Sequence, residues 1–167
     1  MQINKSDFDI VTLEDEIRVD GLCRALLMAF YETLLADGMD QAAATRLANG
    51  ADHFIRDFII GVKMMNIFTK RSGLVRQFAG NWYIVNTLEP KAEYLADSLP
   101  GVAGFYRFLA GKGLISSEYC KQVEDECADL QFYASRIESF WDIQGDGFID
   151  WEKECPLQDR HSSAGLA

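Results

Sequence analysis

Apolar residues recur at spacings of three and four along almost the whole chain, and no segment sustains an alternation of period two. The first pattern lines one face of an α-helix, whereas a half-buried β-strand requires the second. The best strand candidate, Trp82 to Val85, is short and has helical flanks. The chain has 167 residues, 49% of them hydrophobic, which suits one packed core. We therefore expect an all-α fold, a single-domain bundle of roughly five to seven helices.

Capping residues predict where the first two helices begin and end. Thr12 and Asp15 form a variant of the capping box, so the first helix should begin directly after Thr12. Asp37 and Gly38 provide the left-handed stop that ends it, and Asp20-Gly21 is a point at which it could break once. Asp40 is suited to cap the second helix.

Glycine, proline and serine residues mark the later boundaries. The segment from Gly61 to Gly73 either forms an irregular lid or continues the second helix, and a third helix should run from Leu74 to about Asn86. Pro90 and Pro100 are each suited to the first turn of a further short helix. Beyond Ser116, a strict three-four alternation from Cys120 to Trp141 predicts one long helix with a narrow seam for a single partner helix.

Two parts of the chain have similar sequences when they are aligned at an offset of 75 residues, which we call the internal echo. Each part is a helix, a glycine stop, a short link and a second helix, which is the pattern of two similar helical hairpins. Amphipathic helices that end in glycine also resemble one another for purely physical reasons, so both a true duplication and chance similarity stay open. The matched residues are Phe30-Tyr31 with Phe105-Tyr106, Leu34 with Leu109, Gly38 with Gly113, and Met39 with Leu114.

Charge and composition restrict the partners and the compartment. The net charge of −10 repels phosphate backbones and anionic lipids, so nucleic acid and membrane are unexpected partners. The N-terminus is acidic and no long apolar run is present, which favours a cytoplasmic protein. Four cysteines without a CxxC pair suit buried thiols. The small and polar residues from Cys155 to Ala167 predict a flexible tail after a body of residues 1–154.

One basic segment stands out in this acidic chain. Four bases and no acid lie between Phe58 and Leu88. The rest of the chain contains the other twelve bases and all 26 acids, so it has a net charge of −14. Aromatic and methionine residues accompany these bases, a composition typical of interface cores. We expect this segment to contact a protein partner, through Lys63, Phe68, Lys70, Arg71, Arg76 and Trp82.

The chain contains none of the nucleotide-binding, metalloprotease or hydrolase motifs that carry recognisable chemistry. It has two histidines, and His53 beside the apolar stripe of the second helix is interpreted as a partly buried structural imidazole. The sequence therefore favours a non-catalytic protein, with no catalytic residue assigned. An enzyme that uses carboxylates in an unrecognised pocket remains an alternative.

The strongest local motif is Asp142-Ile-Gln-Gly-Asp-Gly-Phe-Ile-Asp-Trp-Glu-Lys153, which follows a predicted helix that ends in Phe140-Trp141. It resembles the calcium-binding loop of the EF-hand family, with Gly147 at the sharp turn. A hard cation prefers about seven oxygens, and alternate residues of a tight turn can direct oxygens to one point. The family's twelfth position, a bidentate Glu, is Lys153 here, so three interpretations stay open: weak calcium binding, a loop that has lost its metal, and a plain acidic turn. The oxygen ligands implied by the resemblance are Asp142, Gln144, Asp146, the Phe148 carbonyl and Asp150, and Glu152, beside Lys153, is a candidate to replace the missing twelfth ligand.

A fainter similarity covers most of the body. The order of Phe30-Tyr31, Gly38, His53 to Phe58, Gln77 to Trp82 and Phe105 to Gly113 resembles the helical N-terminal arm-type domain of tyrosine recombinases. The resemblance implies a helical bundle that clasps DNA, although an acidic chain lacks the bases that neutralise phosphate.

Taken together, the sequence predicts a helical protein-interaction module that ends in a long helix and an EF-hand-like loop with weak calcium binding. A DNA-clasping domain and a carboxylate enzyme are the alternatives.

Overall fold

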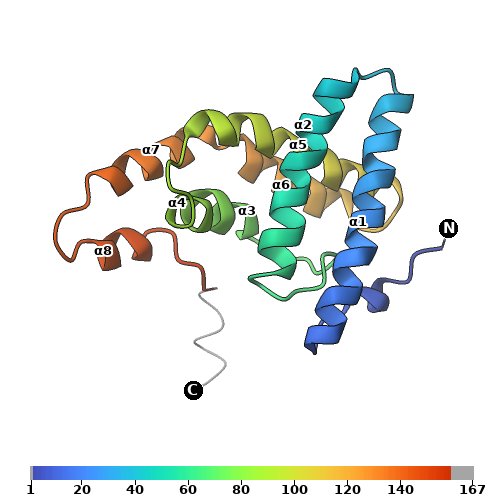
Figure 1. Cartoon of the computed structure of the whole chain (residues 1–167), viewed down its shortest axis with the longest axis horizontal. Coiled ribbons are helices and arrows are strands. Elements are labelled where there is room, and N and C mark those ends of the chain that lie inside the picture. Colours follow the sequence, from blue (N-terminus) through green and yellow to red (C-terminus); the bar gives the residue numbers. More distant parts are fainter. Residues whose placement is uncertain (1, 159–167) are drawn as a thin grey trace.

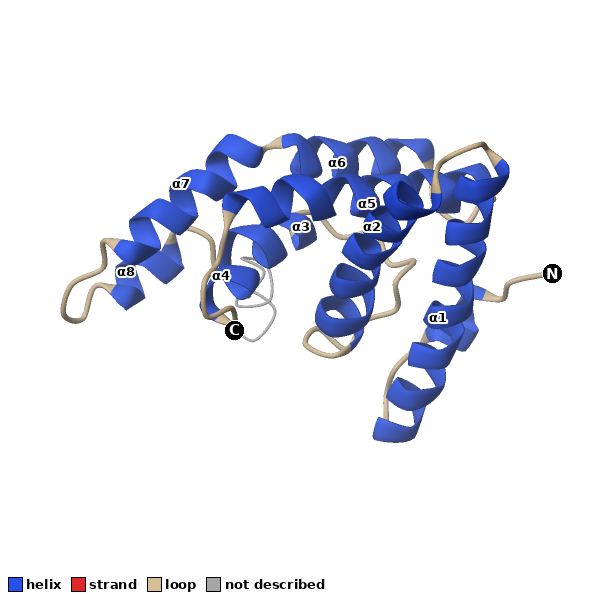
Figure 2. Ribbon diagram, turned by 45° about the horizontal axis from the view of Figure 1, so that its top comes forward, coloured by secondary structure: helices blue, strands red, loops and turns tan. Residues whose placement is uncertain are grey.

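The computed structural model describes residues 2–158, and all regular secondary structure within that range is helical, which confirms the all-α prediction (Figures 1 and 2). Consecutive α and π segments join end to end, so apart from the short 3-10 helix η1 the described chain forms seven helical rods. The elements are η1 (Lys5–Phe8), α1 (Leu13–Ala36), α2 (Gln41–Asp52), η2 (His53–Ile60), α3 (Leu74–Gln77), η3 (Phe78–Trp82), α4 (Tyr83–Val85), α5 (Ala92–Gly111), α6 (Ser117–Ala128), α7 (Leu130–Trp141) and α8 (Phe148–Lys153).

Helix α1 begins at the predicted capping box. The Thr12 side chain accepts from the Asp15 amide, and the Asp15 carboxylate accepts from the Thr12 amide at 2.9 Å. These backbone donors at Thr12 and Val11 lower the pKa of Asp15 to about 2. The predicted break at Asp20-Gly21 does not occur, because a glycine costs a helix only about 1 kcal/mol, less than the burial of Val19 and Cys23 on either side contributes.

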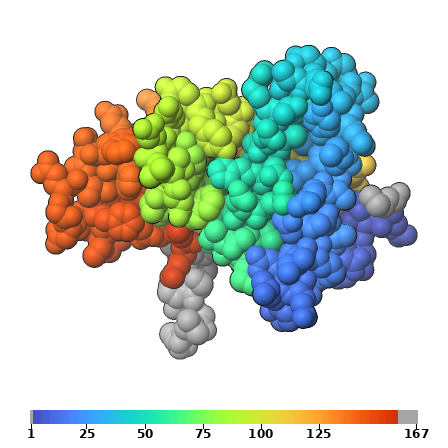
Figure 3. Space-filling view, in the orientation of Figure 1, coloured from blue at the N-terminus to red at the C-terminus, as the bar shows by residue number. Residues whose placement is uncertain are grey.

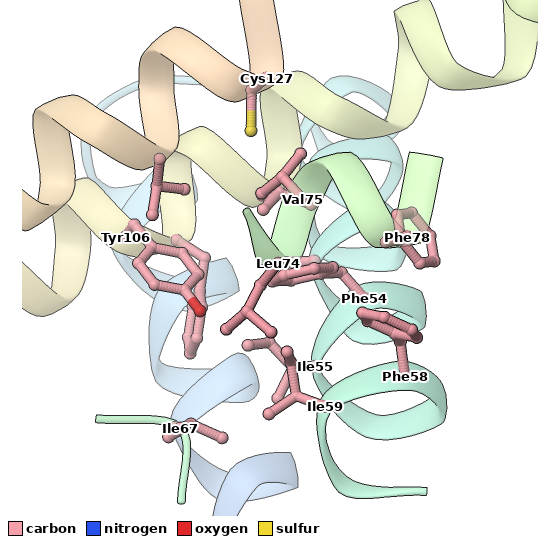
Figure 4. Packing of buried hydrophobic residues seen from close by; sticks show 14 of the residues in the cluster. Phe54, Ile55, Phe58, Ile59, Ile67, Leu74, Val75, Phe78, Tyr106 and Cys127 are labelled. Carbon is pink, nitrogen blue, oxygen red and sulfur yellow. The ribbon is translucent and has the colours of Figure 1, made fainter. Parts of the chain in front are cut away.

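Helix α2 continues into the π-helix η2, and the chain then leaves helical conformation until Leu74. The segment 61–73 is therefore the irregular lid rather than a continuation of the helix. Met65 and Ile67 bury their side chains from this lid, and Figure 4 places Ile67 beneath the core residues Ile55 and Ile59. The third helix runs through α3, η3 and α4 as predicted.

The prediction of two short helices opened by Pro90 and Pro100 is wrong, since α5 is a single helix with Pro100 inside it. Pro100 cannot donate to the carbonyl of Ala96, but both residues are exposed, so water can serve that carbonyl. Close packing on α2 keeps the helix intact. A Cβ on Gly50 would lie 2.3 Å from the Ser98 carbonyl oxygen, and one on Gly101 would lie 2.0 Å from that of Leu47.

The predicted long helix from Cys120 to Trp141 is also interrupted, at Asp129 between α6 and α7. The Glu126 carbonyl, in the last turn of α6, accepts from the Tyr133 hydroxyl at 2.6 Å and from the Asp129 amide at 3.3 Å, so it is satisfied without a continuous helix. The predicted seam is only partly kept beyond Cys127. Ile137 is still buried, but Trp141 is 59% exposed and Tyr133, outside the seam, is buried, because the helix phase changes.

The two echoing segments form matching turns. Gly38 and Gly113 both have positive φ, at 93° and 71°. Met39 donates to the Leu34 carbonyl and Leu114 donates to that of Leu109, the same six-to-one bond of a glycine-terminated helix. The two aromatics that the echo aligns, Phe30 and Phe105, meet edge to face at 5.6 Å between ring centroids, so the α1–α2 and α5–α6 hairpins contact each other at equivalent points.

The body extends past residue 154. Cys155 is buried and its thiol lies 3.2 Å from the Arg76 carbonyl, while the Lys63 ammonium donates to the Leu157 carbonyl at 2.6 Å. The predicted tail therefore cannot begin at Cys155, and its residues 159–167 lie outside the described part of the chain. All four cysteines are buried thiols. No helix among residues 2–158 is long and apolar enough to cross a membrane.

Candidate functional site

The helices α7 and α8 form a hairpin, residues 130–153, at the end of the molecule opposite α1 (Figures 1 and 3). We refer to it as the α7–α8 hairpin. A buried arginine, Arg136, attaches it to the bundle: Nε donates to the Gly80 carbonyl at 2.9 Å and Nη1 to the Trp151 carbonyl at 2.7 Å. The guanidinium also lies 3.8 Å from the centre of the Trp151 ring. Because one side chain binds a carbonyl of η3 and a carbonyl of α8, Arg136 joins these two elements.

A continuous row of aromatic rings runs across the hairpin. Trp141 contacts Phe140 at 6.0 Å, Phe140 contacts Trp151 at 5.1 Å, and Trp151 stacks on Phe148 at 5.9 Å between centroids. The middle of the row is buried at Trp151, but its two ends are open: Trp141 is 59% exposed and Phe148 is 42% exposed. Ile149, next to Phe148, is 61% exposed. Large apolar side chains exposed together are typical of a binding surface.

A hollow and several exposed acids also lie at the hairpin. The hollow, with a volume of about 350 Å³, lies beside α8 and is lined by Asn81, Val85, Asn86, Phe148, Ile149, Glu152 and Leu157. The hairpin itself, residues 130–153, carries five carboxylates against Arg136 and Lys153, which gives it a net charge of −3. The hairpin therefore combines exposed apolar side chains with an excess of acids. Glu138, Asp142, Asp146 and Asp150 are exposed, and we refer to these four as the acidic rim.

The loop that resembles an EF-hand lies within this hairpin. Asp142, Asp146 and Asp150 are all exposed. The left-handed turn falls at Gly145 (φ 58°) and not at Gly147 (φ −68°), and α8 already begins at Phe148. Across residues 2–158 no three His, Cys, Asp or Glu side chains form a group that could hold a metal ion.

Of the remaining predicted ligands, some are exposed to solvent and one is hydrogen-bonded within the protein. Gln144 and Phe148 are exposed, whereas the Glu152 carboxylate accepts from Asn81 at 3.5 Å and from the Leu157 amide at 3.4 Å. In this conformation the predicted ligands thus do not converge on one point, and calcium binding there would require the loop to rearrange.

Several of the predicted basic and aromatic interaction residues make contacts within the bundle. Arg76 pairs with Asp129 at 3.0 Å and lies over the Phe132 ring, and Arg71 lies 3.2 Å from the Met65 sulfur. Lys63 is bound to the Leu157 carbonyl. The structure thus uses several of these bases to hold the lid and α3 in place.

The other predicted interaction residues are Phe68, Trp82 and Lys70. Phe68 packs edge to face on Phe8 at 4.8 Å, and Trp82 stacks on Phe78 at 5.8 Å. Lys70 is exposed. The aromatic side chains of the segment therefore belong to the packing of the bundle.

A cluster around His53 was not predicted as a functional site. His53 is the first residue of η2, and the other π-helix, η3, brings Phe78 and Trp82 against its ring, at 5.2 and 5.7 Å between centroids. Tyr94 of α5 completes the contact, with its hydroxyl 2.5 Å from His53 Nδ1. Burial lowers the pKa of His53 although nearby Asp57 and Asp52 oppose this effect. The sequence offered the aromatic pair Trp82-Tyr83 as a signal, but no local pattern connects it to residues 53 and 94.

Comparisons with known proteins do not place the chain in a family. No family model matches it, and no curated protein and no solved structure matches it either.

Proposed function

We propose that this protein is a non-catalytic helical interaction module that binds a positively charged, amphipathic segment of a partner protein on its α7–α8 hairpin. The observation that carries the proposal is the exposure of Trp141, Phe148 and Ile149 next to the acidic rim. Burying such side chains against a partner is favourable by about 25 cal/mol per Å² of apolar surface. In the isolated chain these side chains stay in contact with water, so this free energy is gained only on binding. The rim then selects a basic partner and accelerates its association.

A designed peptide tests this surface directly. A fluorescently labelled leucine-lysine peptide, helical and amphipathic, should bind the full chain, and a peptide with glutamate in place of lysine should not. Fluorescence anisotropy gives both affinities. Binding should weaken several-fold when salt rises from about 0.05 to 0.5 M, because the Debye length falls below about 5 Å.

Matched variants separate docking from general attraction to an acidic protein. Phe148→Ser combined with Ile149→Ser should weaken binding of the lysine peptide by roughly thirtyfold, since each lost anchor removes about 1 kcal/mol or more. Val11→Ser combined with Leu88→Ser is the control, because these side chains are 83% and 96% exposed elsewhere on the surface. Equal effects of the two double variants would disprove docking at the hairpin.

Calcium binding at the same loop is a second proposal. It is supported by the three exposed aspartates at positions 142, 146 and 150, whose carboxylates are available for a cation. An ion there would neutralise part of the acidic rim and thereby weaken the attraction to a basic partner.

A further inference from the structure

A second cavity, which shares no lining residue with the hairpin hollow, lies at the His53 cluster. It has a volume of about 420 Å³ and lies within the size range of small-molecule sites. Its walls come from three helical elements and the loop before α5, with the residues His53, Tyr83, Thr87, Glu89, Lys91 and Tyr94. The α7–α8 hairpin contributes no residue to it.

The backbone at this cavity is unusual. π-helices are rare and are often found at functional sites, and here two of them meet: η2 begins at His53, and η3 ends at Trp82, directly before Tyr83. Tyr83 stacks on Tyr94 at 5.0 Å with an angle of 20° between the rings. The start of η2 thus brings a histidine next to the stacked tyrosines of α4 and α5.

The hydrogen bonds determine which polar groups remain available. A neutral His53 with its proton on Nε2 fits its neighbours, because the Tyr94 hydroxyl then donates to Nδ1. Nε2 lies 3.9 Å from Asp57 Oδ2, which is too far for a hydrogen bond. The Tyr83 hydroxyl accepts from the Lys91 amide at 3.0 Å. The Tyr94 hydroxyl donates its proton to His53, and Ser98 acts on the same oxygen through a side-chain hydrogen bond. The remaining lone pair can accept from a ligand that donates.

The charges around the cavity are mostly negative. Asp52 and Asp57 lie close enough to His53 to act on it, and Glu93 acts on Tyr83. Glu89 lies in the wall itself, whereas Lys91 is the single base among the lining residues. Carboxylates and the faces of tyrosine rings both attract cations.

From these observations we propose that the cavity between Tyr94, His53 and Glu89 binds a small organic ammonium ligand. The ammonium group donates to the Tyr94 oxygen and lies against the exposed part of the Tyr94 ring, which is 37% exposed in all. Glu89 neutralises its charge. This site is separate from the protein-docking surface and does not depend on it.

Three probes of the same shape test the ligand chemistry: benzylammonium, benzyl alcohol and benzoate. NMR titrations would follow the imidazole signals of His53 in a His161→Gln background, which leaves a single histidine in the chain. Benzylammonium should shift these signals saturably, benzyl alcohol should bind about tenfold more weakly because it lacks the charge, and benzoate should not bind.

Variants then test the location. Tyr94→Leu should abolish benzylammonium binding, and Glu89→Gln, on an exposed side chain that cannot disturb the core, should weaken it a few-fold. Tyr31→Leu is the control, because Tyr31 lines a different hollow between α1 and α2. No binding of benzylammonium, binding of benzoate with equal affinity, or an unchanged affinity in Glu89→Gln would each overturn the proposal.

Discussion

Individual glycines decide how closely the helices of this bundle approach. Gly101 has no room for a methyl group, since an added Cβ would lie 2.0 Å from the Leu47 carbonyl oxygen. Gly101→Ala should therefore lower the free energy of unfolding by about 1–3 kcal/mol, as overpacking does. Gly111→Ala, at the end of the same helix with no atom within 4 Å, should instead raise it by about 0.5–1 kcal/mol. Urea denaturation would measure both, and a destabilisation of equal size in the two variants would contradict the close crossing.

His53 gives the stability of the protein a pH dependence with a definite sign. Its pKa in the folded protein is below the ordinary value of 6.5 because of burial, so the unfolded state binds more protons as the pH falls below that value. The neutral imidazole thus makes its full contribution to the free energy of unfolding above pH 6.5. This contribution is lost as the pH falls from 6.5 toward the pKa of His53 in the folded state.

An NMR titration of His53 should accordingly give a midpoint below 6.5. In His53→Gln, the free energy of unfolding should change less steeply with pH in this range, since the replaced side chain does not titrate. A midpoint at or above 6.5 would show that Asp57 and Asp52 outweigh the burial.

At the scale of single elements, the loop between α7 and α8 permits a sharp test of calcium binding. The resemblance to an EF-hand supplies about five protein oxygens without the twelfth-position Glu, so affinity should lie near 10⁻⁴ to 10⁻³ M. Lys153→Glu should tighten binding by roughly tenfold, because it removes a positive charge and adds two oxygens. Trp141 and Trp151 flank the loop and should sensitise bound terbium, so luminescence provides the measurement.

The control for charge alone is Lys70→Glu, which makes the same substitution at an exposed residue outside the hairpin. Asp146→Asn should remove the signal. If terbium luminescence is absent from both the natural protein and Lys153→Glu, the loop is an acidic turn.

Across the whole molecule, Arg136 links the C-terminal end to the bundle. Arg136→Met would leave the Gly80 and Trp151 carbonyls without their buried donor, and each such loss costs about 1–3 kcal/mol. We expect the free energy of unfolding to fall by about 2–4 kcal/mol and tryptophan emission to shift to the red as α8 separates. Arg107→Met is the control, because Arg107 forms an exposed ion pair with Glu124, and such pairs contribute at most about 1 kcal/mol. A loss in Arg136→Met no larger than in the control would show that α8 is held by its other contacts.

The sequence by itself determined the features that depend on neighbours three or four residues apart. The helical period predicted the fold class, Thr12 and Asp15 predicted the start of α1, and Gly38 and Gly113 predicted two helix ends. These signals are local because capping bonds and glycine turns close within one helical turn.

The tertiary structure decided the features whose partners are distant in the chain. Helix α5 continues across Pro100 because α2 packs on it, and the seam of the predicted long helix changes phase at Asp129, whose carboxylate pairs with Arg76 of α3. The His53 cluster joins three segments that no periodicity relates. Such contacts are governed by the burial and hydrogen bonding available only once helices meet, so the sequence predicted the helices while their packing decided where the candidate sites lie.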